Sequence, residues 1–170
     1  GLEIICTGKI TTFSGQSKYQ IIVESIEISG EGALLKLFEV RKRKFLKLGY
    51  FENNQKQRLP FLPRSLAIIT SKSGAVIQDM INRVLDRFPL KIYLFSVSVQ
   101  GINSSNEISN AIKKINKLKF DKILHDVDVI IIARGGGSVE DLWGFNEENV
   151  IISTFAVSYT HLRAHETDRH

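Results

Sequence analysis

The sequence predicts an α/β fold, a parallel sheet with helices on both faces, preceded by the last strands of a small β-domain. Three short apolar runs alternate with amphipathic helical patterns over residues 65–156, which is typical of a Rossmann-like βαβαβ unit covered on both sides. Two runs rich in Ile and Val lie near the N-terminus instead and have no helix between them. These observations predict two kinds of architecture in one chain.

The first predicted elements are strands at residues 4–10 and 19–28, separated by a turn at Ser14-Gly15-Gln16-Ser17. Two strands alone make a marginal hairpin, so we interpret residues 1–29 as the end of a β-domain whose beginning is missing. The chain also opens on Gly1 instead of methionine, which agrees with a missing start.

Residues 30–64 are predicted to be a helix followed by a linker. The helix is expected over 33–48, where five apolar residues fall on one face and Gly49 ends the pattern; these residues are Leu34, Leu37, Phe38, Phe45 and Leu48. The segment after it is polar and then carries Pro60 and Pro63, as expected of a linker.

The α/β domain is predicted over 65–156, with strands at 66–70, 92–99 and 127–133 and helices at 75–88 and 106–118. Sheets of this kind bind ligands at the carboxyl ends of their strands. The loops that follow the three strands should therefore meet at one edge and form the ligand site.

Composition narrows the class of protein without deciding it. No apolar run approaches the roughly 20 residues of a membrane helix, nothing resembles a signal peptide, and the single cysteine, Cys6, suits a reducing cytoplasm. Residues 1–65 carry 11 Lys/Arg against 6 Asp/Glu, and residues 66–170 carry 12 of each. The basic front third indicates either a nucleic-acid surface or a solvated helix face.

The strongest chemical motif is the loop Arg134-Gly135-Gly136-Gly137-Ser138 after the third strand. Glycines leave backbone N–H groups open to an anion, and an arginine offers two parallel hydrogen bonds to a phosphate. Ser138 is expected to begin a helical turn that includes Glu140. We predict contact with phosphate or a nucleic-acid backbone; the alternative is a tight turn without a ligand.

The loop Ser71-Lys72-Ser73-Gly74, after the first strand, is a second candidate phosphate site through Ser71 and Ser73. The equally weighted alternative is a serine N-cap with no ligand. Asp79 lies in the following helix, where an ion pair with Arg83 at i+4 is the simpler interpretation. The acidic residues Asp126, Asp128, Glu140 and Asp141 fall at opposite edges of the predicted sheet, so a metal site is not expected.

Several motifs occur in a characteristic order: 59–64 (Leu-Pro-Phe-Leu-Pro-Arg), 69–75 (Ile-Thr-Ser-Lys-Ser-Gly-Ala), Val99-Gln100-Gly101, and 133–143 (Ala-Arg-Gly-Gly-Gly-Ser-Val-Glu-Asp-Leu-Trp) followed by Phe145-Asn146. Together they resemble the large subunit of exodeoxyribonuclease VII over residues 1–156.

The resemblance implies a nuclease that degrades single-stranded DNA to short oligonucleotides without an added divalent metal, so no cofactor is expected. It implies that residues 1–29 are the last strands of an OB-fold. It also implies a small-subunit partner, whose binding region is absent here.

The catalytic residues that the resemblance implies are Asp79, Arg134, His165 and Asp168. The last two lie in Ala164-His165-Glu166-Thr167-Asp168, where the family has Gly-His-Glu-Thr-Asp. Residues 157–170 show no strand pattern and resemble a translated sequencing adapter, so we interpret them as a non-native tail. Two alternatives to the nuclease stay open: a kinase-like nucleotide-phosphate-binding domain, and an inactive DNA-binding fragment.

Overall fold

A computed structural model describes residues 4–12, 19–28, 31–52, 56, 58–157 and 160–164. The chain divides into two compact units, with the boundary between Val40 and Arg41. Helix α1 (Glu31–Lys47) contributes residues to both units. The domain limits expected from the sequence stay predictions, since they rest on homology and composition and not on chain compactness.

The N-terminal unit contains an antiparallel hairpin of β1 (Ile4–Thr12) and β2 (Tyr19–Ile28), paired from Ile4↔Ile28 to Thr12↔Tyr19. The register is irregular at Thr7/Gly8, and a Cβ on Gly8 would overlap the carbonyl oxygen of Ile22. The hairpin is therefore as predicted. Its large apolar side chains are exposed, namely Ile4, Ile5, Ile10, Tyr19, Ile21, Ile22, Val23 and Ile26.

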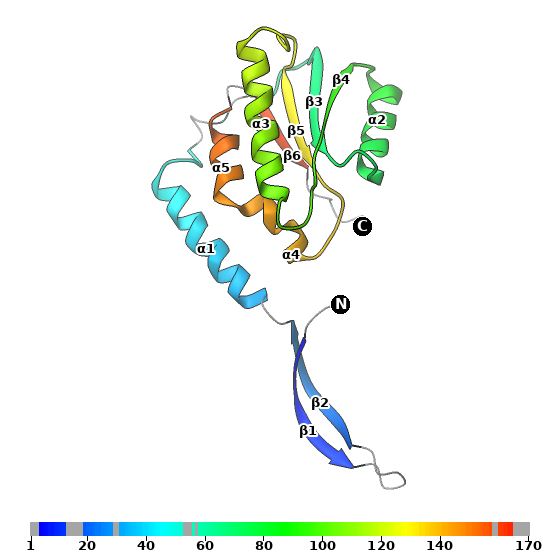
Figure 1. The fold of residues 1–170 in the computed structure, drawn as a ribbon, viewed down its shortest axis with the longest axis vertical. Helices are drawn as coiled ribbons and strands as arrows, with labels where there is room; N and C mark the ends of the chain where they lie inside the picture. The colour runs from blue at the N-terminus through cyan, green and yellow to red at the C-terminus, as the bar shows by residue number, and fades with distance from the viewer. Residues whose placement is uncertain are drawn as a thin grey trace. The chain divides into compact units, whose positions relative to one another are not determined.

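The second unit is built on a parallel sheet with the strand order β4-β3-β5-β6 (Figure 1). Its strands are β3 (Ser65–Thr70), β4 (Lys91–Ser96), β5 (Val129–Ala133) and β6 (Thr160–Ala164). Its other helices are α2 (Ala75–Arg87), α3 (Ser104–Phe120), α4 (Val139–Leu142), the 3-10 turn η2 (Trp143–Asn146) and α5 (Glu148–Phe155). The α/β fold predicted from the alternating apolar runs is confirmed.

Strand β3 is the centre of this unit, because all six of its residues are buried. Ala67 and Ile69 pack with α3 and α5 on one face of the sheet, whereas Leu66 and Ile68 pack with α2 on the other (Figure 1). Burial on both faces explains why the strand is apolar at consecutive positions instead of alternate ones.

Strand β6 corrects the sequence analysis, which expected no strand after Ala156. The structure pairs β6 with β5 in parallel, from Val129↔Thr160 to Ala133↔Ala164. A parallel ladder is formed by backbone groups, and the outer edge of β5 offers a row of them. Side-chain pattern is therefore a poor guide to a strand added at that edge.

No helix in the described ranges is both long and apolar enough to span a bilayer.

The α3 side of the core yields a stability prediction. Ile112 is 0% exposed and packs among the buried residues of β3 and β5, so Ile112→Ala should lower the free energy of unfolding by about 2–5 kcal/mol. Urea denaturation of the chain measures this. Lys113→Ala, at an exposed position of the same helix, is the control and should change it by less than about 0.5 kcal/mol; equal losses in the two variants would contradict the assignment of this core.

Candidate functional site

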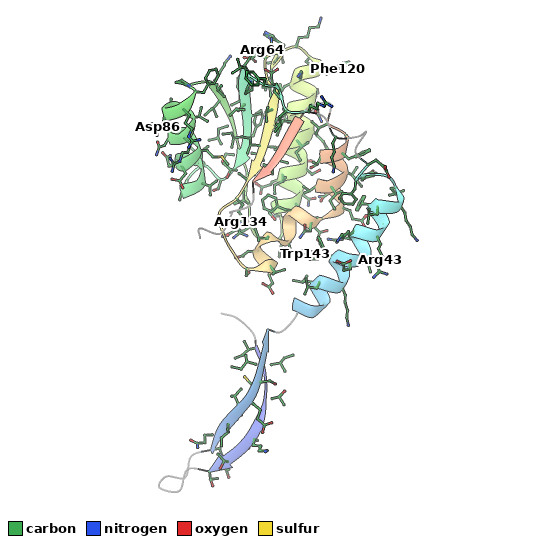
Figure 2. All side chains as sticks on the ribbon, turned by 180° about the vertical axis from the view of Figure 1, so that it is seen from behind. Arg43, Arg64, Asp86, Phe120, Arg134 and Trp143 are labelled. Carbon is green, nitrogen blue, oxygen red and sulfur yellow. The ribbon has the colours of Figure 1, made fainter. Side chains whose placement is uncertain are left out.

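Three loops leave the sheet at the same edge, because β4, β3 and β5 are parallel neighbours. They begin after Ser96, Thr70 and Ala133. Arg134 lies at this end of the sheet and Arg64 at the other (Figure 2). The convergence of loops predicted from the sequence is thus observed.

Arg134 is the most unusual residue of this edge, since its side chain is only 8% exposed. Its Nη2 donates a hydrogen bond to Oε1 of Gln100 at 3.2 Å and lies 3.4 Å from Oδ2 of Asp141. Its Nη1 is buried and has no hydrogen-bond partner among the described residues. A buried donor left unpaired costs about 1–3 kcal/mol, and this cost distinguishes Nη1 from the paired polar groups around it.

The glycines of the loop are needed for the space that they leave to neighbouring side chains, and not for an unusual backbone conformation. Neither Gly135 nor Gly137 has a positive φ. A Cβ on Gly137 would stand 2.8 Å from Cζ and 2.9 Å from Nη1 of Arg134, and one on Gly135 would stand 3.3 Å from a methyl group of Val76. Gly137 therefore makes room for the guanidinium, and Gly135 for the start of α2.

The structure contradicts one of the two interpretations of the loop after β3. The N-cap of α2 is Gly74, without a side-chain hydrogen bond, so the serine N-cap alternative is wrong. The Oγ of Ser71 lies over Gly74, where a Cβ would come within 2.6 Å of it, while Ser73 is exposed. In the part of the chain that the structure describes, no N-cap side chain bonds the first N–H groups of α2. These groups lie beside the glycine loop, where Val76 approaches Gly135.

Asp79 is exposed on α2. It follows Val76 by three residues and so lies on the same side of the helix, one turn further from the glycine loop. No ion pair joins it to Arg83 in the part of the chain that the structure describes. The structure thus leaves its carboxylate available near the site; its catalytic role stays a prediction.

The end of the glycine loop behaves as expected. Ser138 is the N-cap of α4 and its Oγ accepts a hydrogen bond from the N–H of Asp141 at 3.3 Å. This bond holds Asp141 close to Arg134. The other two predicted catalytic residues, His165 and Asp168, lie outside the described residues.

Asp126 and Asp128 lie at the opposite edge of the sheet, as predicted. Asp128 accepts hydrogen bonds from the Arg64 backbone N–H at 2.8 Å and from its guanidinium at 3.2 and 3.3 Å. Asp126 accepts from the Tyr93 hydroxyl at 3.0 Å and from Lys91 at 3.4 Å. These hydrogen bonds hold together the residues at the beginnings of the strands. Among the described residues, no group of three or more His, Cys, Asp or Glu could hold a metal ion.

Basic residues of the front third form internal ion pairs. Arg41 donates to the carbonyl of Asn146 at 3.0 Å and to Glu147 at 2.9 Å, and lies 5.3 Å from the centre of the Trp143 ring. Lys9, Lys44 and Arg64 also pair with carboxylates. Part of the N-terminal positive charge is therefore paired with carboxylates of the same chain, and both interpretations of the charge stay predictions.

Gln100 and Asp141 are the site residues that the sequence analysis missed. Gln100 is named there only as part of a motif, and Asp141 only as part of a motif and as one of four acidic residues that are not expected to bind a metal. Their signal was position: each follows a strand end at the predicted ligand edge. Their contact with Arg134 depends on loop geometry, which residue spacing does not give.

Comparison with known proteins agrees with these motifs. The sequence profile described as "Exonuclease VII, large subunit" matches residues 50–169. The chain belongs to the exonuclease VII large subunit family. It is 51% identical over 99% of its length to a protein of Beijerinckia indica and 46% identical over 99% to one of Bartonella henselae, both named exodeoxyribonuclease 7 large subunit.

The chain spans about a third of these relatives, 31% and 36% of their respective lengths. The profile of the exonuclease VII family extends over His165 and Asp168. The interpretation of residues 157–170 as a non-native tail, and the roles of those two residues, stay predictions.

The Arg64–Asp128 pair predicts a pH effect on stability. The hydrogen bond from the Arg64 side chain lowers the pKa of the Asp128 carboxyl, against the opposing effect of its partial burial. Because the folded pKa lies below the ordinary value of about 3.9, the stabilisation is complete above that value and is lost as pH falls through the lowered one. Asp128→Asn keeps the acceptor and loses the charge, so urea midpoints should fall less steeply with acid; an unchanged acid slope would contradict the assignment.

The position of Gly137 beside Arg134 predicts that a substitution at 137 lowers the affinity for an anion. In Gly137→Ala the new methyl displaces the guanidinium of Arg134, so affinity for inorganic phosphate should fall at least about tenfold, the effect of losing a hydrogen bond to a charged group. Titration calorimetry measures the affinity. Gly135→Ala, whose methyl meets only the Val76 side chain, is the matched control; equal losses in both variants would show that displacement of Arg134 is not the cause.

Proposed function

We propose that the complete protein hydrolyses phosphodiester bonds of single-stranded DNA to short oligonucleotides, and that this chain carries the phosphate-binding part of its active site. The proposal is supported by the family membership and by the names of the relatives. The observation that carries it is the buried, unpartnered Nη1 of Arg134, a donor suited to a phosphate oxygen.

The geometry supplies a way to stabilise the transition state. During phosphoryl transfer, negative charge is spread over the equatorial oxygens, and preorganised donors lower the barrier. Arg134 offers a fixed cation, and the uncapped start of α2 offers backbone N–H groups beside it. One phosphate bound at this edge would therefore meet both kinds of donor.

The base that activates the attacking water belongs to the predicted residues of the site. Asp79, one helical turn from the contact between Val76 and Gly135, is one candidate, and His165 is the other. Asp168 would orient such a histidine, as carboxylates do in other catalytic pairs. Hydrolysis without added divalent metal is part of the proposal and derives from the family resemblance.

The proposal includes two partners, single-stranded DNA and the family's small subunit, and a cytoplasmic location. The commonest version of the kinase-like alternative has a phosphate-binding lysine after the glycines, whereas Ser138, Val139 and Glu140 occupy those positions here.

Replacing Arg134 tests the proposed function. In the complete protein, Arg134→Ala should lower kcat on a single-stranded oligonucleotide in EDTA roughly 100- to 1,000-fold, as removal of one preorganised donor does in other enzymes. Arg134→Lys should recover only a small part, because an ammonium lacks the planar fork. The circular dichroism spectrum and melting temperature should stay close to those of the parent protein.

The control is Arg87→Ala, an exposed arginine at the end of α2, which should cleave at the parental rate. Parental cleavage by Arg134→Ala would refute the role of Arg134. Saturable binding of ATP without affinity for DNA would favour the nucleotide-binding alternative.

A further inference from the structure

We propose that Gln100 is a positioning residue for Arg134: its side-chain amide engages Nη2 so that Nη1 is held toward the scissile phosphate. The inference rests on the proposed function and extends it to a residue with no contact of its own to the reacting atoms. The observation behind it is that the two terminal nitrogens of the guanidinium differ in their contacts. Among the described residues, Nη2 has two partners and the buried Nη1 has none.

The path of the chain explains how Gln100 reaches Arg134. Gln100 follows β4, whereas Arg134 follows β5, and the two strands are separated by β3 in the sheet. The segment after β4 therefore has to pass the end of β3. It starts against that end, because the N–H of Val97 donates to the carbonyl of Thr70 at 3.0 Å and so continues the pairing of β4 with β3. The crossing brings the amide of Gln100 above the central strand, next to the glycine loop.

This crossing segment is fixed at further points on its C-terminal side. The Oε2 of Glu107 accepts from the N–H of Ser98 at 2.7 Å. The carbonyl of Gly101 accepts from the N–H and the hydroxyl of Ser104, at 3.1 and 2.8 Å, and Gly101 itself has a φ of 85°, which favours glycine. A side chain on a segment held in this way can orient its partner, because its own backbone has little freedom.

The inference also depends on the Gln100 side chain being uncharged. Asp141 already brings a carboxylate to Nη2, and at 47% exposure it is partly screened by solvent. An amide oxygen at position 100 accepts a hydrogen bond without adding negative charge next to an incoming phosphate. A carboxylate there would hold the guanidinium equally well and repel the phosphate.

The test uses the complete protein and a single-stranded oligonucleotide. Gln100→Ala should lower kcat about 10- to 100-fold, as expected for loss of one hydrogen bond to a charged group, with a smaller change in KM. Gln100→Glu, which keeps the shape, should raise KM more than it lowers kcat. Ser98→Ala, an exposed position of the same segment, is the matched control and should behave as the parent.

A double-mutant cycle with Arg134 separates positioning from a general structural effect. If Gln100 acts through Arg134, Gln100→Ala has no further effect on kcat once Arg134 is alanine. If it lowers kcat by the same factor in both backgrounds, or if Gln100→Ala alone cleaves at the parental rate, the inference is overturned. If Arg134→Ala itself cleaves at the parental rate, the proposed function is refuted. The experiment therefore distinguishes a failure of the proposed function from a failure of this inference.

Discussion

A guanidinium almost removed from water is the constraint to which the other parts of this site conform. A charged group at low exposure must be surrounded by acceptors or it destabilises the fold. Arg134 meets this requirement at one nitrogen only, through Gln100 and Asp141. Gly137 has no side chain because the guanidinium occupies the space where one would stand. Within the described residues the hydrogen bonding of this guanidinium is incomplete at one defined atom, the buried Nη1.

The two edges of the sheet show how similar residues serve different purposes. At the edge where the strands begin, Arg64 donates backbone and side-chain hydrogen bonds to Asp128. At the edge where they end, Arg134 keeps a donor unpaired. Both residues are arginines near a carboxylate, and sequence patterns do not tell them apart. The number of paired hydrogen-bond donors distinguishes the two arginines, because a structural ion pair leaves no donor free for a ligand.

Much of the second unit could be predicted from sequence because its determinants are local. Apolar runs gave β3 and β5, amphipathic periods gave α2 and α3, and the glycine loop fell where parallel sheets bind ligands. What was missed depends on distant contacts. Strand β6 forms through backbone pairing at an edge, and the contact of Gln100 with Arg134 requires a chain crossing over β3. The start of α2 at Ala75 was predicted, whereas its glycine N-cap without a side-chain hydrogen bond was not, since a serine is the commoner cap.

The close approach of Gly137 to Arg134 has a consequence for how such a loop changes during evolution. The side chain tolerated at position 137 depends on the length and course of the side chain at position 134, so the two positions form one coupled unit. An alanine at 137 becomes acceptable only when 134 carries a shorter residue or a different rotamer. The glycine at 137 is thus tied to the arginine at 134, and in related sequences these two positions should vary together or not at all.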